Sequence, residues 1–235
     1  MTFHRRTFLQ AAAAASLALA LPARAAPMRL GIIGSGRVGG TIGELWVKAG
    51  HEVVFSARTL DEVNALLERL KLGPRARAGT PKEAAAFGEA VLVSVPYSAL
   101  PSIGRENAAE LRGKVVLDTS NPIPGRDGDM AKPFLEKGAG LSSQELLPGT
   151  RLVRAFNCVG WNAMRTEAHR AGEKLAIPVA ADDPSALKVA ISLVQDAGFE
   201  PVVVGGLARA KEFDYGTPIF GRQVTAKELR TILKI

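Results

Sequence analysis

The feature that most constrains the fold is a glycine-rich turn near the start of the chain, Gly34-Ser35-Gly36-Arg37-Val38-Gly39. An apolar run, residues 28–33, precedes it, and a segment with apolar residues at helical spacing, residues 38–49, follows it. In such a strand–turn–helix unit the first glycine allows the tight turn, the second lets a pyrophosphate approach the backbone, and the third lets helix and strand pack closely. The unpaired N–H groups at the helix start attract phosphate. The turn therefore predicts a dinucleotide site formed by Gly34, Ser35, Gly36, Arg37, Val38 and Gly39.

Short apolar runs alternate with helix-like segments along the rest of the chain. We expect strands at 30–33, 52–55, 91–95, 115–118 and 152–155, a weaker edge strand at 75–78, and helices at 61–70, 81–87 and from 184 onward. This alternation predicts an α/β fold, a doubly wound and mostly parallel Rossmann-type sheet with a small C-terminal subdomain.

Proline and glycine modify this pattern in two places. A further strand is expected at 175–180, and because Pro178 lacks an N–H group we expect it at an edge of the sheet. Several Gly and Pro residues with scattered charges make residues 121–140 look like a long loop that serves a site.

The first residues resemble a signal for bacterial twin-arginine export. Arg5-Arg6 stands before Phe8-Leu9, an apolar stretch covers 11–21, and Ala23-Arg24-Ala25 offers a cleavage site. We therefore expect three parts: a signal peptide at 1–25, a dinucleotide-binding domain at 26–156, and a C-terminal α/β subdomain at 157–235 that completes the substrate cleft. The signal implies the export machinery as a partner and a periplasmic or exported location, without a stable membrane span. If translation instead starts at Met28, the protein is cytoplasmic.

Charge and cysteine content narrow the classes of partner. The formal net charge is +7, but no Lys/Arg block or aromatic-interleaved basic face stands out, which favours an anionic cofactor and argues against nucleic acid. Cys158 is the only cysteine, so no internal disulfide forms, and we interpret it as a packed residue. The three histidines lack metal-ligand spacing, so no metal site is predicted. A homodimer is left open.

The end of the second expected strand decides the choice of cofactor. An NAD-binding fold places Asp or Glu there to bind the ribose hydroxyls, whereas this chain has Ser56, Ala57 and Arg58. With no carboxylate to repel a 2′-phosphate and a guanidinium suited to bind one, the cofactor is predicted to be NADP. The alternative is that Arg58 is only a solvated surface residue. Val95, Pro96 and Tyr97, after the fourth strand, are expected near the nicotinamide half, although a partly buried rim tyrosine is an equal alternative.

Several segments together resemble the NADPH-dependent reductases of coenzyme F-420, a deazaflavin, and their relatives grouped with pyrroline-5-carboxylate reductase. The matching pieces, over about residues 28–213, are the glycine turn, Gly50-His51-Glu52-Val53-Val54, Val95-Pro96, Asp118-Thr119-Ser120-Asn121-Pro122, Ala155-Phe156-Asn157 and Gly198-Phe199-Glu200-Pro201. The resemblance implies that Ser35, Arg37, Val38 and Arg58 contact NADP, and Ser56, at the end of the second strand, is predicted to join them. It implies that Pro96, Asn121, Pro122 and Asn157 border the acceptor, and Tyr97, after the fourth strand, is predicted to line the same cleft. Residues 205–235 match poorly, so their role is not predicted.

The expected reaction needs no catalytic side chain. Hydride passes from nicotinamide to a flat acceptor, a small molecule like a deazaflavin or flavin, and the protein contributes stacking geometry. Carbonyl or imine reduction would need a proton donor, for which His169, Lys211 and Tyr215 are the candidates. A module that binds NADP without turnover is the other alternative.

Overall fold

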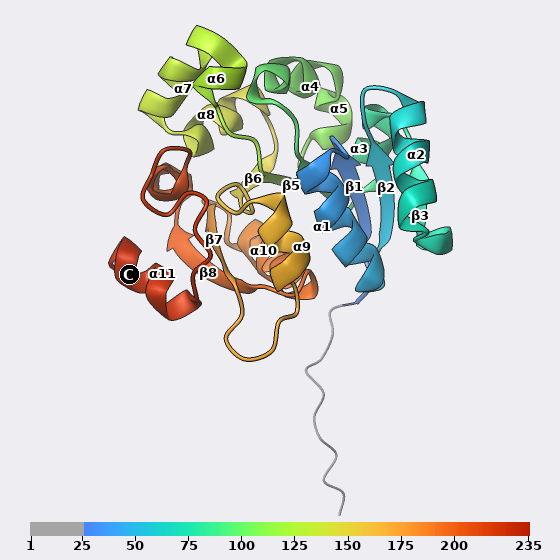
Figure 1. Cartoon of the computed structure of the whole chain (residues 1–235). Coiled ribbons are helices and arrows are strands. Elements are labelled where there is room, and N and C mark those ends of the chain that lie inside the picture. The colour runs from blue at the N-terminus through green and yellow to red at the C-terminus, as the bar shows by residue number, and fades with distance from the viewer. Residues whose placement is uncertain (1–25) are drawn as a thin grey trace, which may run out of the picture.

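The computed structural model describes residues 26–235 and contains one eight-stranded sheet in the order β3-β2-β1-β4-β5-β6-β7-β8 (Figure 1). The strands are β1 (Arg29–Ile33), β2 (Glu52–Ser56), β3 (Ala76–Ala78), β4 (Ala90–Val93), β5 (Val115–Asp118), β6 (Arg151–Arg154), β7 (Ala176–Ala181) and β8 (Glu200–Gly205). Every neighbouring pair is parallel except β6 and β7. The predicted Rossmann-type fold is therefore confirmed, with β3 at one edge. The predicted signal peptide lies outside the described residues.

Both faces of the sheet are covered, and β4 shows why its sequence is apolar throughout. Ala90 and Leu92 pack into one core cluster, while Val91 and Val93 pack into another. Successive strand residues point to opposite faces, so a strand buried on both faces needs an apolar residue at every position. The first face is covered by α1 (Arg37–Lys48), α2 (Leu60–Leu70), α9 (Trp161–Glu167) and α10 (Pro184–Asp196), and the second by α3 (Pro81–Phe87), α4 (Leu100–Glu106), α5 (Ala108–Leu111) and α8 (Ala139–Leu146). The last helix, α11 (Ala226–Leu233), packs against β7 and β8.

Local capping explains where several of these helices begin. Thr80 and Glu83 form a reciprocal capping box at the start of α3, with Pro81 in its first turn. Asp183 caps α10 by accepting from the N–H groups of Ser185 and Ala186. The two crossovers α1 and α10 are joined across the face because the indole N–H of Trp46 donates to the carbonyl of Leu193 at 2.8 Å.

The segment predicted as a long loop, residues 121–140, is largely helical, so that prediction was wrong. It contains α6 (Pro124–Asp127), η3 (Gly128–Met130), α7 (Ala131–Lys137) and the start of α8. Its glycines separate short helices instead of opening a loop: Gly128 ends α6 with φ +66°, and Gly138 ends α7 with φ +98°. Both angles lie in a region that favours glycine. The remaining 3₁₀ segments are η1 (Gly73–Arg75), η2 (Tyr97–Ala99) and η4 (Leu207–Phe213).

Strand β7 is not at the edge, which corrects the expectation drawn from Pro178. It lies between β6 and β8, but only Ala180 and Ala181 pair with β6, whereas Pro178 pairs with β8 alone. The missing N–H therefore falls on a part of the strand that has one neighbour, where it costs no ladder hydrogen bond. Because β7 and β8 extend the same sheet, the domain boundary after residue 156 stays a prediction. No helix within residues 26–235 is long and apolar enough to cross a membrane.

Candidate functional site

The glycine turn has the backbone shape that its sequence predicts. Gly34 adopts φ +96°, and a Cβ atom there would lie 2.3 Å from the carbonyl oxygen of Ser94. At Gly39 a Cβ would lie 2.2 Å from the oxygen of Gly34, so only glycine allows α1 to start this close to β1. At Gly36, by contrast, a Cβ would meet nothing within 4 Å. The N-terminus of α1 carries no side-chain cap and faces open space, as a dinucleotide cradle requires.

Hydrogen bonds to the end of β2 hold the turn in place. The backbone N–H groups of Gly34 and Ser35 donate to the carbonyl of Ser56 at 3.0 and 2.8 Å, and the hydroxyl of Ser35 donates to the same oxygen at 2.9 Å. The hydroxyl of Ser56 in turn donates to the carbonyl of Ile32 at 2.7 Å. Ser56 is fully buried. Its side chain thus braces the turn and is not exposed to a cofactor, which corrects its predicted role.

A cavity of about 450 Å³, here called the cleft, opens beside the turn. It is lined by residues 36–38 of the turn, 94–96 after β4, 119–121, 123 and 126 after β5, 157–161 after β6, and 220–221 near the C-terminus. The parallel strands β1, β4, β5 and β6 all end at this edge, and the chain order reverses between β1 and β4. Such a switch point is where open α/β sheets bind ligands.

The cleft brings together many of the predicted residues but not all of them. Arg37, Val38, Val95, Pro96, Asn121 and Asn157 line it. Pro122 is buried outside the lining.

Tyr97 belongs to the core and not to the cleft, so its predicted place was wrong. It is fully buried, and its hydroxyl lies 3.1 Å from Ser143 Oγ and donates to the carbonyl of Ala139 at 3.4 Å. The turn η2 directs the ring away from the cleft into the face covered by α8, against Phe134. Burial raises the pKa of the Tyr97 hydroxyl above its ordinary value, so the phenol is neutral.

A buried ion cluster lies under the cleft and was not predicted. The guanidinium of Arg154, fully buried at the end of β6, donates to Asp118 Oδ2 at 2.6 Å and to Asp214 Oδ1 at 3.1 Å. Burial alone would lower the pKa of Arg154, but the two carboxylates hold it above the ordinary value. The cluster ties β5, β6 and the segment after η4 into one unit.

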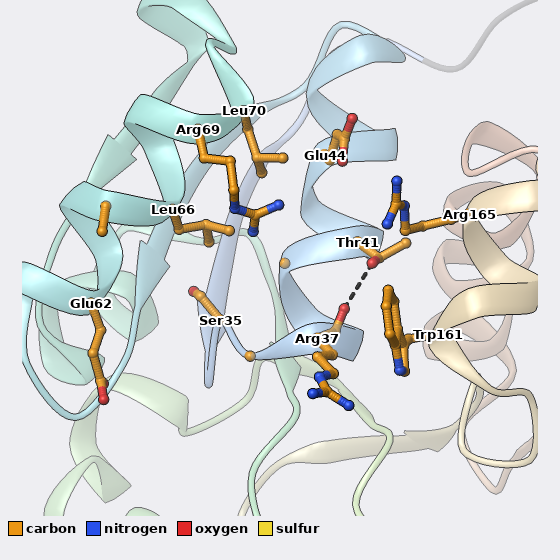
Figure 2. Close-up of a pocket in the computed structure, with 13 residues that line it drawn as sticks. Ser35, Arg37, Thr41, Glu44, Glu62, Leu66, Arg69, Leu70, Trp161 and Arg165 are labelled. Atoms are coloured by element: carbon orange, nitrogen blue, oxygen red, sulfur yellow. Dashed lines mark hydrogen bonds between the residues drawn. The ribbon is translucent and has the colours of Figure 1, made fainter.

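A larger groove of about 770 Å³ lies on the outer side of α1, between α2 and α9 (Figure 2). Its lining includes Arg37, Arg69, Trp161 and Arg165. The guanidinium carbons of Arg37, on α1, and Arg165, on α9 beside Trp161, lie 5.3 and 5.8 Å from the centre of the Trp161 ring. Trp161 and Arg37 also line the cleft, so this stack forms the wall between cleft and groove.

Arg58, the residue predicted to select NADP, lines neither cavity. Its side chain is 91% exposed and pairs with Glu62 at 3.3 Å. An exposed pair of this kind is weak and easily exchanged for a phosphate, so the predicted role of Arg58 stays a prediction.

The residues that complete the cleft from distant parts of the chain carry no motif that would have predicted them. Phe220 and Gly221 close it from the C-terminal segment, whose role was not predicted. Cys158 lines the wall, and burial raises the pKa of its thiol to about 12, in keeping with a packed residue. None of the three candidate proton donors lines the cleft, but the ring of Tyr215 packs on Phe220, which does, with centroids 5.2 Å apart. Within the described residues no three His, Cys, Asp or Glu side chains gather as metal ligands would.

The fold and the cleft together define a Rossmann-type dinucleotide-binding protein. A family model described as NADP oxidoreductase, coenzyme F420-dependent, matches residues 29–122, from β1 to the residues after β5. The F420-dependent NADP reductase of Methanothermobacter thermautotrophicus is 25% identical over 204 residues, which are 82% of this chain and 87% of that protein. These similarities support an NADP oxidoreductase with NADP as its cofactor.

Solved structures share the fold more widely. A hypothetical protein from Sinorhizobium meliloti superposes with a TM-score of 0.73 at 22% identity, over 85% of this chain and 96% of its own. An imine reductase from Myxococcus stipitatus, solved with NAD+, superposes with a TM-score of 0.59 at 17% identity, over 80% of this chain and 58% of its own. At these identities the likeness concerns the fold.

Proposed function

We propose that the protein transfers hydride between NADPH and a flat redox acceptor of the deazaflavin or flavin kind. One observation carries the proposal: the cleft beside the glycine turn is lined by backbone, apolar and neutral polar groups and two arginines, without an Asp, Glu, His, Lys or Tyr side chain. A wall of this composition can position two rings but offers no proton donor of the ordinary kind.

NADPH would supply a hydride, two electrons with one proton, to the acceptor ring, whose second proton comes from solvent. The residues of the chain act by holding geometry. The N–H groups at the start of α1 and the side chain of Arg37, which lines the cleft, would bind the pyrophosphate. Val95 and Pro96 form an apolar platform after β4. Residues 220–221 line the cleft from the opposite segment.

The open backbone at Gly36 and two unpartnered buried polar atoms in the cleft, on Ser120 and Asn157, fit a bound dinucleotide and ring. Without a ligand, the space beside Gly36 would stay empty and the polar atoms of Ser120 and Asn157 would lack hydrogen-bond partners. We therefore assign NADP contacts to the glycine turn and acceptor contacts to Asn121 and Asn157.

The direct test is a parallel assay of NADPH oxidation with a 5-deazaflavin, with FMN, and with small ketones and cyclic imines. We expect turnover with the flat acceptors, and we expect Asn157→Leu to lower kcat more than NADPH affinity. Turnover confined to a ketone or imine, and lost in Tyr215→Phe, would replace this proposal by the reductase alternative that the imine reductase fold suggests. Tight NADPH binding without oxidation by any acceptor would favour the binding module.

We also propose export by the twin-arginine route, on the basis of Arg5-Arg6 and the apolar stretch after them. That route carries folded proteins, and a protein that uses NADP meets it in the cytoplasm, so folding around the cofactor before export is consistent. Replacing both arginines by lysine should leave the precursor in the cytoplasm, as followed by fractionation. Normal export of that variant, or a mature protein that begins at Met28, would contradict the proposal. A homodimer stays a prediction that light scattering can measure.

A further inference from the structure

Two side chains in the cleft have buried polar atoms that the protein itself does not satisfy. Asn157 is 4% exposed and Ser120 is 3% exposed, and both line the cleft. Among the described residues, Asn157 Oδ1 and Ser120 Oγ have no hydrogen-bond partner. Native proteins leave few buried polar atoms unpaired, because each one loses its hydration without compensation. Two other buried atoms of the described residues, Ser142 Oγ and Arg154 Nε, also lack a partner, but neither residue lines the cleft. Ser120 and Asn157 do line it, so theirs are the two atoms that a ligand in the cleft can pair with.

The orientation of the Asn157 amide follows from its neighbours. Its Nδ2 group donates to the backbone carbonyl of Phe213 at 3.2 Å and to Asn121 Oδ1 at 3.4 Å. A carbonyl can only accept, so the Nδ2 end must face Phe213 and the oxygen must face the other way. Oδ1 is thus a pure acceptor that waits for a donor.

Arg154 orients the Asn157 amide indirectly, through Asn121. Its Nη2 group donates to Asn121 Oδ1 at 3.4 Å, while Asn121 Nδ2 donates to the backbone carbonyl of Asn157 at 2.8 Å. A guanidinium is always a donor, which fixes the amide of Asn121 and, through it, the amide of Asn157. The buried ion cluster acts here as a positioning group for the cleft.

Ser120 is fixed by its backbone and not by its hydroxyl. Its N–H donates to Asp118 Oδ1 at 2.8 Å, and its carbonyl accepts from Arg154 Nη1 at 2.7 Å. The hydroxyl contributes no bond to the fold. A hydroxyl donates one hydrogen bond and accepts others, so it can serve a carbonyl oxygen.

We propose that Asn157 Oδ1 and Ser120 Oγ recognise an amide edge, an N–H donor with a neighbouring C=O acceptor, on the ring that enters the cleft. This inference rests on the proposed function and adds the chemical group that is read. Two sources carry such an edge: the carboxamide of the nicotinamide, and the cyclic imide of a flavin or deazaflavin.

The test compares two matched serine variants. Ser120→Ala removes the unpartnered hydroxyl in the cleft, and Ser142→Ala removes another buried, unpartnered hydroxyl, on α8 outside both cavities. Neither loss breaks a protein hydrogen bond, so thermal unfolding should stay close to that of the unmodified protein for both. Asn157→Leu serves as the second cleft variant.

Calorimetric titration with three probes separates the sources. The probes are NADP+, 2′-phospho-ADP-ribose, which is NADP+ without the nicotinamide, and FMN. If the carboxamide is read, Ser120→Ala weakens NADP+ binding by about threefold to tenfold and leaves the fragment unchanged. If the two side chains bind the imide of the acceptor, Ser120→Ala weakens FMN binding by a similar factor and leaves NADP+ binding unchanged. In both cases Ser142→Ala behaves like the unmodified protein, and Asn157→Leu weakens the same ligand as Ser120→Ala.

The proposal is overturned if Ser120→Ala and Asn157→Leu bind NADP+ and FMN as the unmodified protein does, which would assign the two atoms to water. An equal loss of the fragment and of NADP+ would also overturn it, since the fragment has no amide edge. If these two variants keep both the NADP+ affinity and the turnover of the unmodified protein, the amide-edge proposal fails but the proposed function is unaffected. Absence of NADP+ binding by the unmodified protein would instead remove the proposed function, and FMN would then decide whether an amide edge is read.

Discussion

Two arginines are candidates for binding the 2′-phosphate. Arg58 follows the end of β2, and Arg69 lies in the groove beside α1 (Figure 2). If Arg58 binds the 2′-phosphate, Arg58→Ala loses a charge-assisted contact of about 1.5 to 3 kcal/mol, or roughly one to two decades in NADPH affinity, and spares NADH. Arg69→Ala is the control, with little effect on either nucleotide. A loss confined to Arg69→Ala, measured by calorimetry, would move the phosphate into the groove.

At the same scale, the buried thiol of Cys158 should make the free energy of unfolding decrease at alkaline pH. An unfolded thiol ionises near pH 8.5, whereas burial raises the pKa of Cys158 to about 12 in the folded protein. Between these values the unfolded state releases a proton that the folded state keeps, so stability falls as pH rises, by at most about 1.4 kcal/mol per pH unit. Denaturant unfolding at pH 7.5 and pH 10 should show a smaller loss for Cys158→Ser. An equal loss in both proteins would mean that the thiol ionises in place.

At the scale of elements, the glycine turn offers a matched pair of substitutions. Gly39→Ala places a methyl group 2.2 Å from a backbone oxygen, so α1 must move, and we expect a loss of about 1 to 3 kcal/mol in unfolding free energy. Gly36→Ala meets nothing in the protein and has φ −69°, so it should fold normally but obstruct the dinucleotide. Unfolding curves and NADPH titrations on both variants check this. Normal NADPH affinity in Gly36→Ala would show that the cofactor does not pass over this residue.

Elements differed in how well the sequence predicted them. The strands of the parallel core were predictable because burial on both faces demands uninterrupted apolar residues, as in β4. The helices at 124–146 were not, because they are short and their buried positions are small residues such as Ala131, Ala139 and Ser142, which leave no apolar periodicity. Their glycines were interpreted as loop signals when they are helix ends.

At the scale of the whole molecule, the continuous sheet makes a prediction about cooperativity. Residues 157–235 contribute β7 and β8 to the same sheet, and the indole of Trp46 on α1 bonds to α10. We therefore expect a single calorimetric unfolding transition, with the van't Hoff and calorimetric enthalpies in agreement. Two resolved transitions would show that the predicted subdomain folds as a separate unit.

Whole-molecule contacts also explain which parts of the site escaped prediction. The residues on the turn and directly after β4, β5 and β6 follow strands, so the rule for parallel sheets places them at one edge. Phe220, which lines the cleft, and Asp214, which binds Arg154, come from a segment without a strand–loop pattern. Nothing in the local sequence predicts that this segment folds back onto the site. Ser120 and Arg154 lie within or beside recognised motifs. Their roles become visible only from the hydrogen bonds in the folded protein, such as the one between Arg154 Nη1 and the Ser120 carbonyl.

The buried guanidinium of Arg154 has a consequence for the order in which the protein is made. A charge can leave water only when its counter-charges are present, and Asp214 is synthesised 60 residues after Arg154. In a nascent chain that ends before Asp214, Arg154 should therefore stay hydrated. The cleft residues that Arg154 holds, Ser120 and Asn121, then stay unfixed. We expect a chain ended at residue 213 to remain sensitive to protease after release, while the full chain resists. The ability to hold a dinucleotide then arrives late in translation, as a property of the finished polypeptide.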